Sequence, residues 1–382
     1  MSGAKYRVII AGAGGIGRAA GLLLQELADF EVDLYLGDRY EAVAQDAVQW
    51  IEAESERKGK VLSFVMPENE SDKNFEQVLR RADIILDCLP GNQAPRIAKL
   101  ARDFELHYAN LTEYVKETRE VQKIARGATK GFILQAGLAP GFINVLSNGL
   151  FQKFCHNYQV ETVENVNMKV GALTQNAYPP YFYGFTWSPV GVATLYVKPA
   201  TIIRDFQTTV KASLTERSKI ILHGIEYEED LTSGGAADLP ETLAGKTRTL
   251  DYKTLRYPGH YDWIESILRE IPHGEDRVAK LQAKMEGTIP ASEEDLVVIY
   301  ASVTGKDHRG RLHILEKYYL IKPFTVAGKT MRAIQATTAA GLAECARLLL
   351  SNQYSGCILQ SQIDPDDFLN GPFVRQVYQS SH

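Results

Sequence analysis

A short apolar run followed by a glycine-rich turn opens the chain, and this feature constrains the fold most. Residues 6–17 spell YRVIIAGAGGIG, in which Gly12, Gly14 and Gly17 follow a β-type run and precede an amphipathic helical pattern. The first glycine permits a tight turn, the second lets the backbone approach a pyrophosphate, and the third lets the helix pack closely on the strand. The helix N-terminus then offers N–H groups and partial positive charge to the phosphates. The sequence therefore predicts a dinucleotide site.

An acidic residue at the expected spacing strengthens this prediction. The next apolar run, EVDLYLGD, ends at Asp38, roughly 20 residues beyond Gly17, as expected of a carboxylate that holds a ribose 2′-hydroxyl. Asp38 would repel a 2′-phosphate and so favours NAD. The adjacent Arg39 could pair with such a phosphate, which leaves NADP open.

Length and composition describe an ordinary globular protein. The 382 residues are 45% hydrophobic and 23% charged, which suits two or three domains. The formal net charge is −5, so neither nucleic acid nor an anionic membrane is expected as a main partner. No apolar run approaches the roughly 18 residues that a transmembrane helix needs. The N-terminus shows no signal-peptide pattern, and we expect a cytoplasmic protein.

Cysteine and histidine usage predicts neither disulfides nor a metal site. The four cysteines, Cys88, Cys155, Cys345 and Cys357, form no CxxC pair and have no histidine at metal-ligand spacing. Free thiols in a reduced compartment are the simplest interpretation. His156 adjoins Cys155, but adjacent residues on a helix point in different directions, so a structural role is expected there.

The N-terminal part of the chain alternates strand-like and helical patterns. In the first helical stretch, Ile16, Ala20, Leu23 and Leu27 fall on one face. Such alternation predicts a Rossmann-like, doubly wound α/β fold, a parallel sheet with helices on both faces. The predicted strands are Arg7–Ala11, Val32–Leu36, Val61–Met66, Asp83–Cys88, Leu106–Ala109 and Phe132–Gln135.

Beyond about residue 160, β-type runs replace the helical periodicity. They predict an α+β domain with a mostly antiparallel sheet, in which Lys306–Asp307 and Arg309–Gly310 form the turn of a hairpin. The segment Leu231–Lys246, rich in Gly, Asp and Thr, is expected to be an exposed loop. The predicted strands are Val166–Leu173, Val192–Val197, Thr208–Leu214, Ser218–Leu222, Leu296–Thr304 and Leu312–Ile321.

A long helical pattern returns over Met331–Asn352, and we expect it to pack on the first domain. The chain is therefore predicted to contain a dinucleotide-binding Rossmann domain over residues 1–140, completed by a C-terminal helical return over 331–382. Residues 141–330 are predicted to form the α+β domain that binds substrate, carries the catalytic residues and mediates dimerisation.

Ligands of such sheets bind beyond the carboxyl ends of the strands, so the loops that follow the strands are further candidates. Asn110–Thr112 is expected to N-cap a helix over Glu113–Arg126, and Pro140 to be the first residue of the helix Phe142–Phe154. The alternative is that these glycines and prolines only form turns. The candidate cofactor-binding residues are Gly12, Gly14, Gly15, Ile16, Gly17, Asp38, Arg39, Cys88, Leu89, Pro90, Leu111, Gly137 and Pro140.

An aromatic segment in the second domain, Tyr178–Pro189, combines tyrosine, phenylalanine and tryptophan with rigid prolines. Aromatic walls suit an aliphatic substrate chain beside a nicotinamide ring. A dimer interface or a core corner would show the same enrichment, and both interpretations stay open. Thr186 and Trp187 are the candidate catalytic residues of this segment.

The segment Leu255–His260 offers a cation, a phenol and an imidazole within one turn. Arg256 could bind a substrate carboxylate with two parallel hydrogen bonds. His260 could take the proton that an amine must lose before its carbon is oxidised. Tyr257 lies between them and completes the candidate catalytic set. A histidine after Pro-Gly is more often a turn or capping residue, which is the alternative for His260.

Several of these segments together resemble the saccharopine dehydrogenase family. They are GAGGIG, GLAPGF, TWSP (Thr186–Pro189), TLRYPGH (Thr254–His260) and the C-terminal AIQATTAAG, in an order that extends across nearly the whole chain. TWSP and RYPGH look most like the lysine 6-dehydrogenase branch. The glutamate-forming saccharopine dehydrogenases end the equivalent motif with an aromatic residue in place of His260.

The resemblance implies NAD(P)-dependent oxidation at a C–N bond of an amino acid. In the lysine branch the ε-amine becomes an imine, which water opens to a semialdehyde. By matching motif, the three glycines would bind pyrophosphate, Asp38 the adenosine ribose, and Arg256 and His260 the substrate. Saccharopine or carboxynorspermidine is the alternative substrate, and a catalytically silent dinucleotide-binding sensor is the alternative class. A small-molecule substrate and a homodimer are the expected partners.

Overall fold

The chain divides into two units in a computed structural model that describes residues 4–53, 59–68, 72–351 and 354–379. Unit 1 contains Met1–Phe142, Phe324–Met331 and Gln335–Ser380. Unit 2 contains Ile143–Pro323 and Arg332–Ile334. The C-terminal part of the chain thus returns to the unit that contains the glycine-rich turn, and Asn352, the predicted end of the long helix, lies outside the described residues.

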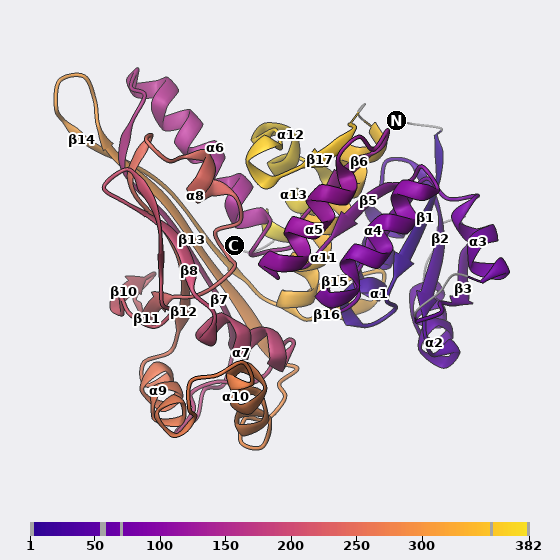
Figure 1. Cartoon of the computed structure of the whole chain (residues 1–382), viewed down its shortest axis with the longest axis horizontal. Coiled ribbons are helices and arrows are strands. Elements are labelled where there is room, and N and C mark those ends of the chain that lie inside the picture. Colours follow the sequence, from indigo (N-terminus) through magenta and orange to yellow (C-terminus); the bar gives the residue numbers. More distant parts are fainter. Residues whose placement is uncertain (1–3, 54–58, 69–71, 352–353, 380–382) are drawn as a thin grey trace. The chain divides into compact units, whose positions relative to one another are not determined.

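Unit 1 is built on a seven-stranded sheet of order β17-β6-β5-β4-β1-β2-β3, in which all neighbouring strands are parallel (Figure 1). This confirms the predicted doubly wound α/β fold. Strand β17 was not predicted, because its three residues are too short to show a period. The strands are β1 (Lys5–Ala11), β2 (Glu31–Asp38), β3 (Val61–Val65), β4 (Ile84–Asp87), β5 (His107–Asn110), β6 (Gly131–Ile133) and β17 (Gly356–Ile358).

Apolar side chains alternate between the two faces of this sheet and hold helices on each. On one face Ile9 and Ile85 pack with residues of α3, α4 and α5. On the other face Ile10 and Leu34 contact the backbone of α1 at Gly21. The helices of this unit are α1 (Gly15–Leu27), α2 (Glu41–Glu52), α3 (Lys73–Leu79), α4 (Ala94–Asp103), α5 (Val115–Ala125), α11 (Ala333–Ser351), α12 (Pro365–Leu369) and α13 (Pro372–Gln379).

Two predicted helix starts in unit 1 are wrong. Helix α5 begins at Val115, and its N-cap is Tyr114; the Thr112 hydroxyl instead accepts the N–H of Tyr114 and forms a local turn. Pro140 is not helical, because α6 begins at Phe142 and Gly141 has a φ of 134°. In both places a tight turn occupies the residues that the sequence pattern assigned to a helix.

Unit 2 contains an eight-stranded mixed sheet with the main order β10-β11-β12-β7-β13-β14. Six of its strand pairs are antiparallel, along this path or beside it, and β12 pairs with β7 in parallel, which confirms a mostly antiparallel sheet. The β13–β14 hairpin is also confirmed. The strands are β7 (Val163–Thr174), β8 (Ala200–Arg204), β9 (Gln207–Lys211), β10 (Ser218–Leu222), β11 (Ile225–Leu231), β12 (Thr247–Arg256), β13 (Asp295–Lys306) and β14 (Leu312–Ile321).

The predicted strand Val192–Val197 is wrong, because these residues belong to helix α7 (Pro189–Val197). Pro189 is the first helical residue, and the Ser188 hydroxyl caps the helix by accepting the N–H of Gly191. The helix is apolar nearly all round and largely buried, so its sequence shows no 3.6-residue period. The other helices of unit 2 are α6 (Phe142–Tyr158), α8 (Leu239–Thr242), α9 (His260–Glu270) and α10 (Arg277–Glu286).

The segment Leu231–Lys246 is not the exposed loop that its composition predicted. Residues 231–240 are buried or half-buried, and the short helix α8 begins at Leu239 within the segment. The Asn144 side-chain amide donates to the carbonyl of Gly235, and a Cβ at Gly235 would lie 2.3 Å from the Tyr252 ring. The glycines here allow close packing and not solvent exposure. No helix among the described residues is long and apolar enough to cross a membrane.

Candidate functional site

The glycine-rich turn of unit 1 is shaped by close backbone contacts. Gly12 has a φ of +96°, and a Cβ there would lie 3.0 Å from the backbone of Cys88 at the end of β4. A Cβ at Gly17 would lie 1.9 Å from the carbonyl oxygen of Gly12. Only glycine fits these two positions, since the first needs the left-handed region and the second lets α1 approach β1.

Gly14 differs from its neighbours because a Cβ there would meet nothing within 4 Å. It is also the N-cap of α1 and supplies no side chain to the free N–H groups of the first helical turn, which contains Gly15, Ile16 and Gly17. Open space therefore lies beside uncapped backbone donors at a positive helix end. This arrangement fits a dinucleotide pyrophosphate.

Asp38 ends β2 beside this turn. Its carboxylate accepts the N–H of Ala13 at 3.2 Å and that of Tyr40 at 3.1 Å, one on each oxygen. Each carboxylate oxygen can accept a further hydrogen bond, so a ribose hydroxyl can still bind. Arg39 is held by Glu68, with 2.6 Å between guanidinium and carboxylate, and it lies over the Tyr40 ring.

The remaining predicted cofactor residues lie at the same edge of the sheet, beyond the carboxyl ends of the parallel strands. Cys88, Leu89 and Pro90 follow β4, Leu111 follows β5, and Gly137 and Pro140 follow β6. Burial raises the pKa of the Cys88 thiol, so this cysteine is a neutral packing group and not a nucleophile.

Sequence reasoning missed two polar groups that shape this edge. Asp87 accepts hydrogen bonds from the Tyr108 hydroxyl at 2.7 Å and from the Leu89 N–H at 3.1 Å. Burial raises the pKa of Asp87 to about 6. The Asn110 side chain accepts the Gln135 N–H at 2.9 Å and so ties the β5 loop to the β6 loop. In the sequence, the signal for both residues is a polar side chain at the end of an apolar, buried strand.

In unit 2, a chain of hydrogen bonds connects Arg256 to His260. The Arg256 Nε donates to the Tyr196 hydroxyl at 2.7 Å, and that hydroxyl lies 2.9 Å from His260 Nε2. His260 Nδ1 lies 2.7 Å from the Tyr181 carbonyl oxygen. Arg256, His260 and Tyr196 are all buried. Tyr196 was missed from the sequence because it lies in the run that was taken for a strand.

These contacts define the protonation of the histidine. A carbonyl oxygen can only accept, so Nδ1 of His260 carries the proton. Nε2 then accepts from the Tyr196 hydroxyl, whose oxygen accepts from Arg256. Burial, aided by the charge of Arg256, lowers the pKa of His260 to about 3. His260 is therefore neutral, with both ring nitrogens occupied.

Arg256 is a buried cation with no acidic partner among the described residues. It is 1% exposed, and its contacts are the Tyr196 hydroxyl, the Leu255 carbonyl and the face of the Tyr183 ring. Glu228 lies opposite Arg256 in the β11–β12 register, but its carboxylate accepts the Gly259 N–H instead. An unpaired buried charge destabilises a fold by several kcal/mol, so this site suits an anionic ligand.

Buried polar groups of the segment Tyr178–Pro189 add to this feature. The Tyr183 hydroxyl, the Thr186 hydroxyl and the Trp187 indole N–H are buried and make no hydrogen bond within the described part of the chain. Burial raises the pKa of Tyr183, and the charge of the neighbouring Arg256 opposes that effect. Native proteins leave few such groups unsatisfied, and each one indicates a missing partner.

The structure does not bring Tyr257 into this cluster. Tyr257 lies one residue beyond Arg256, so it points to the other face of the sheet, where it stacks with Tyr227 and donates to the Thr174 carbonyl. The turn that follows positions the histidine: Gly259 has a φ of +96° and caps α9, which makes His260 the first helical residue.

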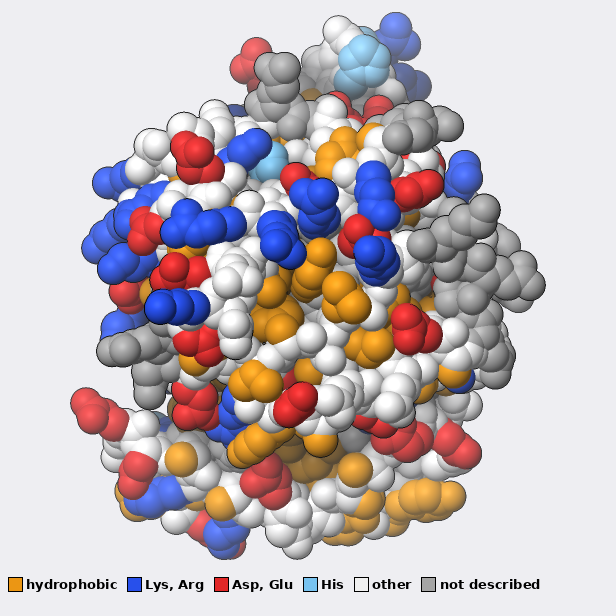
Figure 2. Space-filling view, turned by 90° about the vertical axis from the view of Figure 1, so that its right-hand side faces the viewer, with side chains coloured by type: hydrophobic (Ala, Val, Ile, Leu, Met, Phe, Trp, Pro, Cys, Tyr) orange, Lys and Arg blue, Asp and Glu red, His pale blue; other side chains and the backbone are white. Residues whose placement is uncertain are grey.

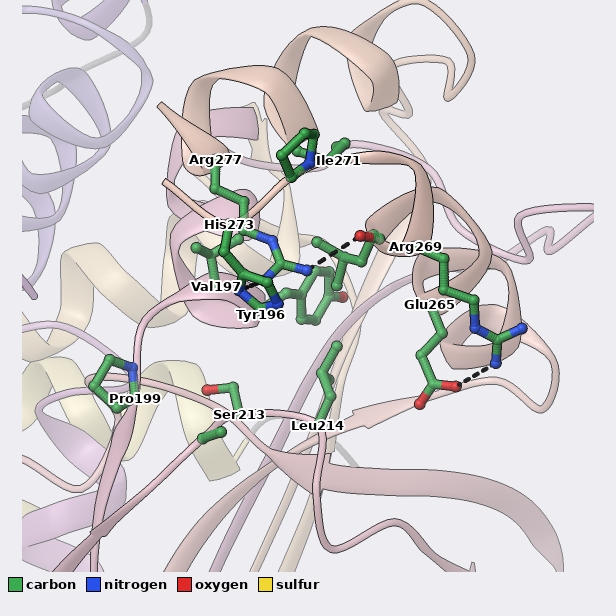
Figure 3. Close-up of a pocket in the computed structure, with 13 residues that line it drawn as sticks. Tyr196, Val197, Pro199, Ser213, Leu214, Glu265, Arg269, Ile271, His273 and Arg277 are labelled. Carbon is green, nitrogen blue, oxygen red and sulfur yellow. Dashed lines mark hydrogen bonds and ion pairs between the residues drawn. The ribbon is translucent and has the colours of Figure 1, made fainter. Parts of the chain in front are cut away.

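Unit 2 also contains a pocket of about 730 Å³ between α7, α9 and the start of α10 (Figure 3). Tyr196 contributes to its wall. In this pocket Arg269 pairs with Glu265, and Arg277 binds His273 and the Leu268 carbonyl. Arg269 is exposed and Arg277 is half-buried, so an anion here would be less shielded from water than at the fully buried Arg256.

Charge is mixed on one face of the molecule, and the cysteines form no disulfide. On the face that Figure 2 shows, acidic and basic side chains are interspersed around apolar ones and do not separate into a basic surface. The four cysteines are free. Within the described ranges, no group of three or more His, Cys, Asp or Glu side chains could hold a metal ion.

Two family models match the chain almost end to end. The saccharopine dehydrogenase NADP binding domain matches residues 8–132, and the saccharopine dehydrogenase C-terminal domain matches residues 137–377. Together they cover both the glycine-rich turn and the Arg256 cluster.

Solved structures share the fold. The apo saccharopine dehydrogenase (L-Glu forming) from Saccharomyces cerevisiae matches with a TM-score of 0.74 and 14% identity, over 95% of this chain and 96% of that one. The homospermidine synthase from Legionella pneumophila, solved in complex with NAD, matches with a TM-score of 0.65 and 12% identity, over 98% of this chain and 90% of that one.

Proposed function

Because the chain belongs to the saccharopine dehydrogenase family, we propose that this NAD(P)-dependent dehydrogenase oxidises a C–N bond of an amino acid, with the ε-amine of L-lysine as its substrate. The observation that carries this proposal is the buried Arg256, which has no acidic partner among the described residues and lies against the Tyr183 ring, whose hydroxyl makes no hydrogen bond there. A carboxylate can satisfy such a group, and an amino-acid substrate has one.

The cofactor is held by unit 1 in this proposal. Gly12, Gly14 and Gly17 and the first turn of α1 bind the pyrophosphate, and Asp38 accepts a ribose hydroxyl. When bound, the nicotinamide takes up two electrons and one hydrogen from the substrate carbon. Asp38 favours NAD, since a 2′-phosphate would lie against its carboxylate, while Arg39 is already paired with Glu68.

Arg256 is the anchor for the substrate carboxylate. A planar guanidinium can donate two parallel hydrogen bonds to a carboxylate, and burial strengthens them. The Tyr196 hydroxyl and the Tyr183 ring hold the guanidinium in place. Thr186 and Trp187 offer further donors from the segment that precedes α7.

His260 is a positioning residue in this account. Its neutral ring accepts the Tyr196 hydroxyl hydrogen and so directs that oxygen toward Arg256. A group whose pKa lies near 3 and whose two nitrogens are occupied is poorly suited to accept a substrate proton near neutral pH. The catalytic role predicted for His260 is therefore replaced here by an indirect one.

The proposed reaction conserves atoms and charge. The substrate nitrogen loses a proton, the adjacent carbon loses a hydrogen with its electron pair to the nicotinamide, and a C=N bond forms. Water then adds to the imine and releases ammonia and the semialdehyde. The protein supplies orientation, a protected carboxylate site and a proton acceptor.

The charge inventory favours a substrate with a single carboxylate over saccharopine, which carries more. The other fully buried cations of unit 2 in the described residues, Lys169 and Lys253, both pair with Glu229. Arg256 alone among these three is free of acids. Saccharopine and carboxynorspermidine remain the alternatives to be tested beside lysine.

The decisive assay follows absorbance of the reduced nicotinamide with NAD and with NADP. The amines compared are L-lysine, saccharopine, carboxynorspermidine and 1,5-diaminopentane, which is lysine without its carboxylate. We expect this absorbance to increase with lysine, and we expect kcat/KM to be at least tenfold lower with 1,5-diaminopentane than with lysine. An increase in absorbance with saccharopine or carboxynorspermidine, but not with lysine, would assign the enzyme to that substrate class instead. Tight dinucleotide binding without any amine oxidation would support a sensor instead.

A homodimer is also part of the proposal. Strand β14 is an edge of the unit 2 sheet, and among the described strands it pairs with β13 alone. Its residues Leu312 and Ile314 are 65% and 52% exposed, and they lie on the same sheet face as Tyr318 and Leu320. An edge strand with exposed apolar side chains is a natural place for a second copy to bind.

A further inference from the structure

The carboxyl group of Glu113 in unit 1 is not part of the cofactor site described above. Glu113 is in the loop between β5 and α5, two residues before the helix begins. It is partly buried, and it makes no ion pair and no hydrogen bond with any residue that the structure describes. A partly buried carboxylate without a partner is destabilising unless a ligand pairs with it.

The position of this loop relative to the cofactor follows from the strand order. Asp38 on β2 holds the adenosine ribose, and the turn after β1 holds the pyrophosphate. The next strands in the sheet are β4 and then β5. A dinucleotide that crosses the sheet edge from β2 over β1 therefore places its nicotinamide half toward the loops after β4 and β5. Glu113 is on the second of these loops.

The loop backbone is fixed by its neighbours. The Thr112 hydroxyl accepts the Tyr114 N–H at 3.3 Å, and a Cβ at Gly91 would lie 2.3 Å from that hydroxyl and 2.7 Å from the Tyr114 ring. The loops after β4 and β5 thus pack on each other, and Gly91 permits it. Such support keeps the residue between Thr112 and Tyr114 in a defined place.

The other acidic and thiol groups at this edge are already occupied, while Arg96 on α4 donates through Nε to Gln93 and keeps one terminal nitrogen without a hydrogen bond in the described residues. Asp87 binds Tyr108 and the Leu89 N–H, and Cys88 is a buried neutral thiol. Tyr114 adjoins Glu113, and Glu117 follows on the first turn of α5; both are negative or neutral, and neither supplies a cation. Burial raises the pKa of Glu113 to about 7, which suits a proton acceptor near neutral pH.

We propose that the Glu113 carboxylate pairs with the reacting ammonium of the substrate and accepts its proton, an assignment that rests on the proposed function. The substrate N–H bond breaks, an O–H bond forms on Glu113, and the nitrogen keeps its electron pair. The carbon then loses its hydrogen with the bonding electrons to the nicotinamide of NAD(P).

The test compares Glu113→Gln and Glu113→Asp with Glu120→Gln, a control at an exposed position of the following helix α5. In the wild type, kcat/KM for lysine should rise with pH and level off above about pH 7, because the deprotonated carboxylate is the active form. We expect Glu113→Gln to lower kcat about 10²–10⁴-fold and to lose this limb of the profile. Glu113→Asp should retain part of the activity and keep the limb, and added small carboxylates should partly restore Glu113→Gln.

Binding and folding are measured separately, by NAD titration and thermal unfolding, which Glu113→Gln should leave within twofold and a few degrees of the wild type. An active enzyme whose pH limb survives in Glu113→Gln would overturn the assignment of Glu113 alone. A wild type that oxidises no amine would overturn the proposed function, and the role of Glu113 with it.

Discussion

A single buried guanidinium links the fold of unit 2 to its proposed substrate. Arg256 ends strand β12 and is satisfied on one side by Tyr196 and by the Leu255 carbonyl. The motif RYPGH indicated an arginine and a histidine near each other, which the structure places in one hydrogen-bonded chain. The intervening Tyr196 is 60 residues away along the chain, so no local pattern could identify it.

Replacement of Arg256 should affect only substrates that carry a carboxylate. Hydrogen bonds to a charged group contribute about 1.5–3 kcal/mol, so Arg256→Gln should raise KM for lysine by roughly 10- to 100-fold. The KM for 1,5-diaminopentane, which lacks the carboxylate, should change less than threefold. Arg204→Gln is the control, since Arg204 pairs with Glu216 and Asp251 in the same unit. Equal losses for both amines would contradict the anchor.

His260 should make stability depend on pH in a defined window. Its pKa is about 3 in the folded protein and about 6.5 in an unfolded chain. Between these values the unfolded chain binds more protons, so the free energy of unfolding falls as pH decreases, by at most about 1.4 kcal/mol per pH unit. Above about pH 6.5 the contribution is constant.

Urea unfolding at pH 4.5, 5.5, 7 and 8 measures this dependence. His260→Gln, which keeps the size and a polar group, should flatten the slope between pH 4.5 and 6.5. His308→Gln, at an exposed position in the β13–β14 turn, should leave it unchanged. If the slopes of His260→Gln and the wild type coincide, the buried neutral histidine is excluded.

At the scale of elements, the β1–α1 segment contains two kinds of glycine, one beside open space (Gly14) and one packed against backbone (Gly17). Gly14→Ala adds a methyl group to open space, so the free energy of unfolding should change by less than about 1 kcal/mol, while the methyl group should weaken NAD binding at least tenfold. Gly17→Ala places a methyl group 1.9 Å from a backbone carbonyl and should destabilise the unit itself. Calorimetry with and without NAD distinguishes the two. Normal NAD affinity in Gly14→Ala would contradict the pyrophosphate site.

Periodicity predicted the elements of unit 1 well because each strand is short, apolar and followed by a turn residue. It failed at α7, where Val192–Val197 is β-branched and apolar but is held in a helix by Pro189 and the Ser188 cap. Composition failed at Leu231–Lys246, where Gly235 serves close packing against Tyr252. At α7 a helix cap and a first-turn proline outweighed the strand preference, and at Gly235 a tertiary contact outweighed the loop-like composition.

At the scale of the whole molecule, the oligomeric state should depend on the β14 edge. Ile314→Glu places a charge on an apolar position that is 52% exposed. We expect light scattering to show a dimer for the wild type and a monomer for this variant. Val210→Glu, at a position on β9 that is 62% exposed, is the control and should leave the dimer intact. A dimer that persists in Ile314→Glu would place the interface elsewhere.

The strand order of unit 1 and the Arg256 cluster of unit 2 support the same proposed chemistry. A substrate that carries both an amine and a carboxylate is oxidised at the carbon next to its amine. The most direct test uses L-lysine that carries deuterium on its ε-carbon. Mass spectrometry should find one deuterium in each reduced dinucleotide, with one ammonia released per dinucleotide. Reduction without deuterium transfer, or no reduction despite dinucleotide binding, would contradict the account.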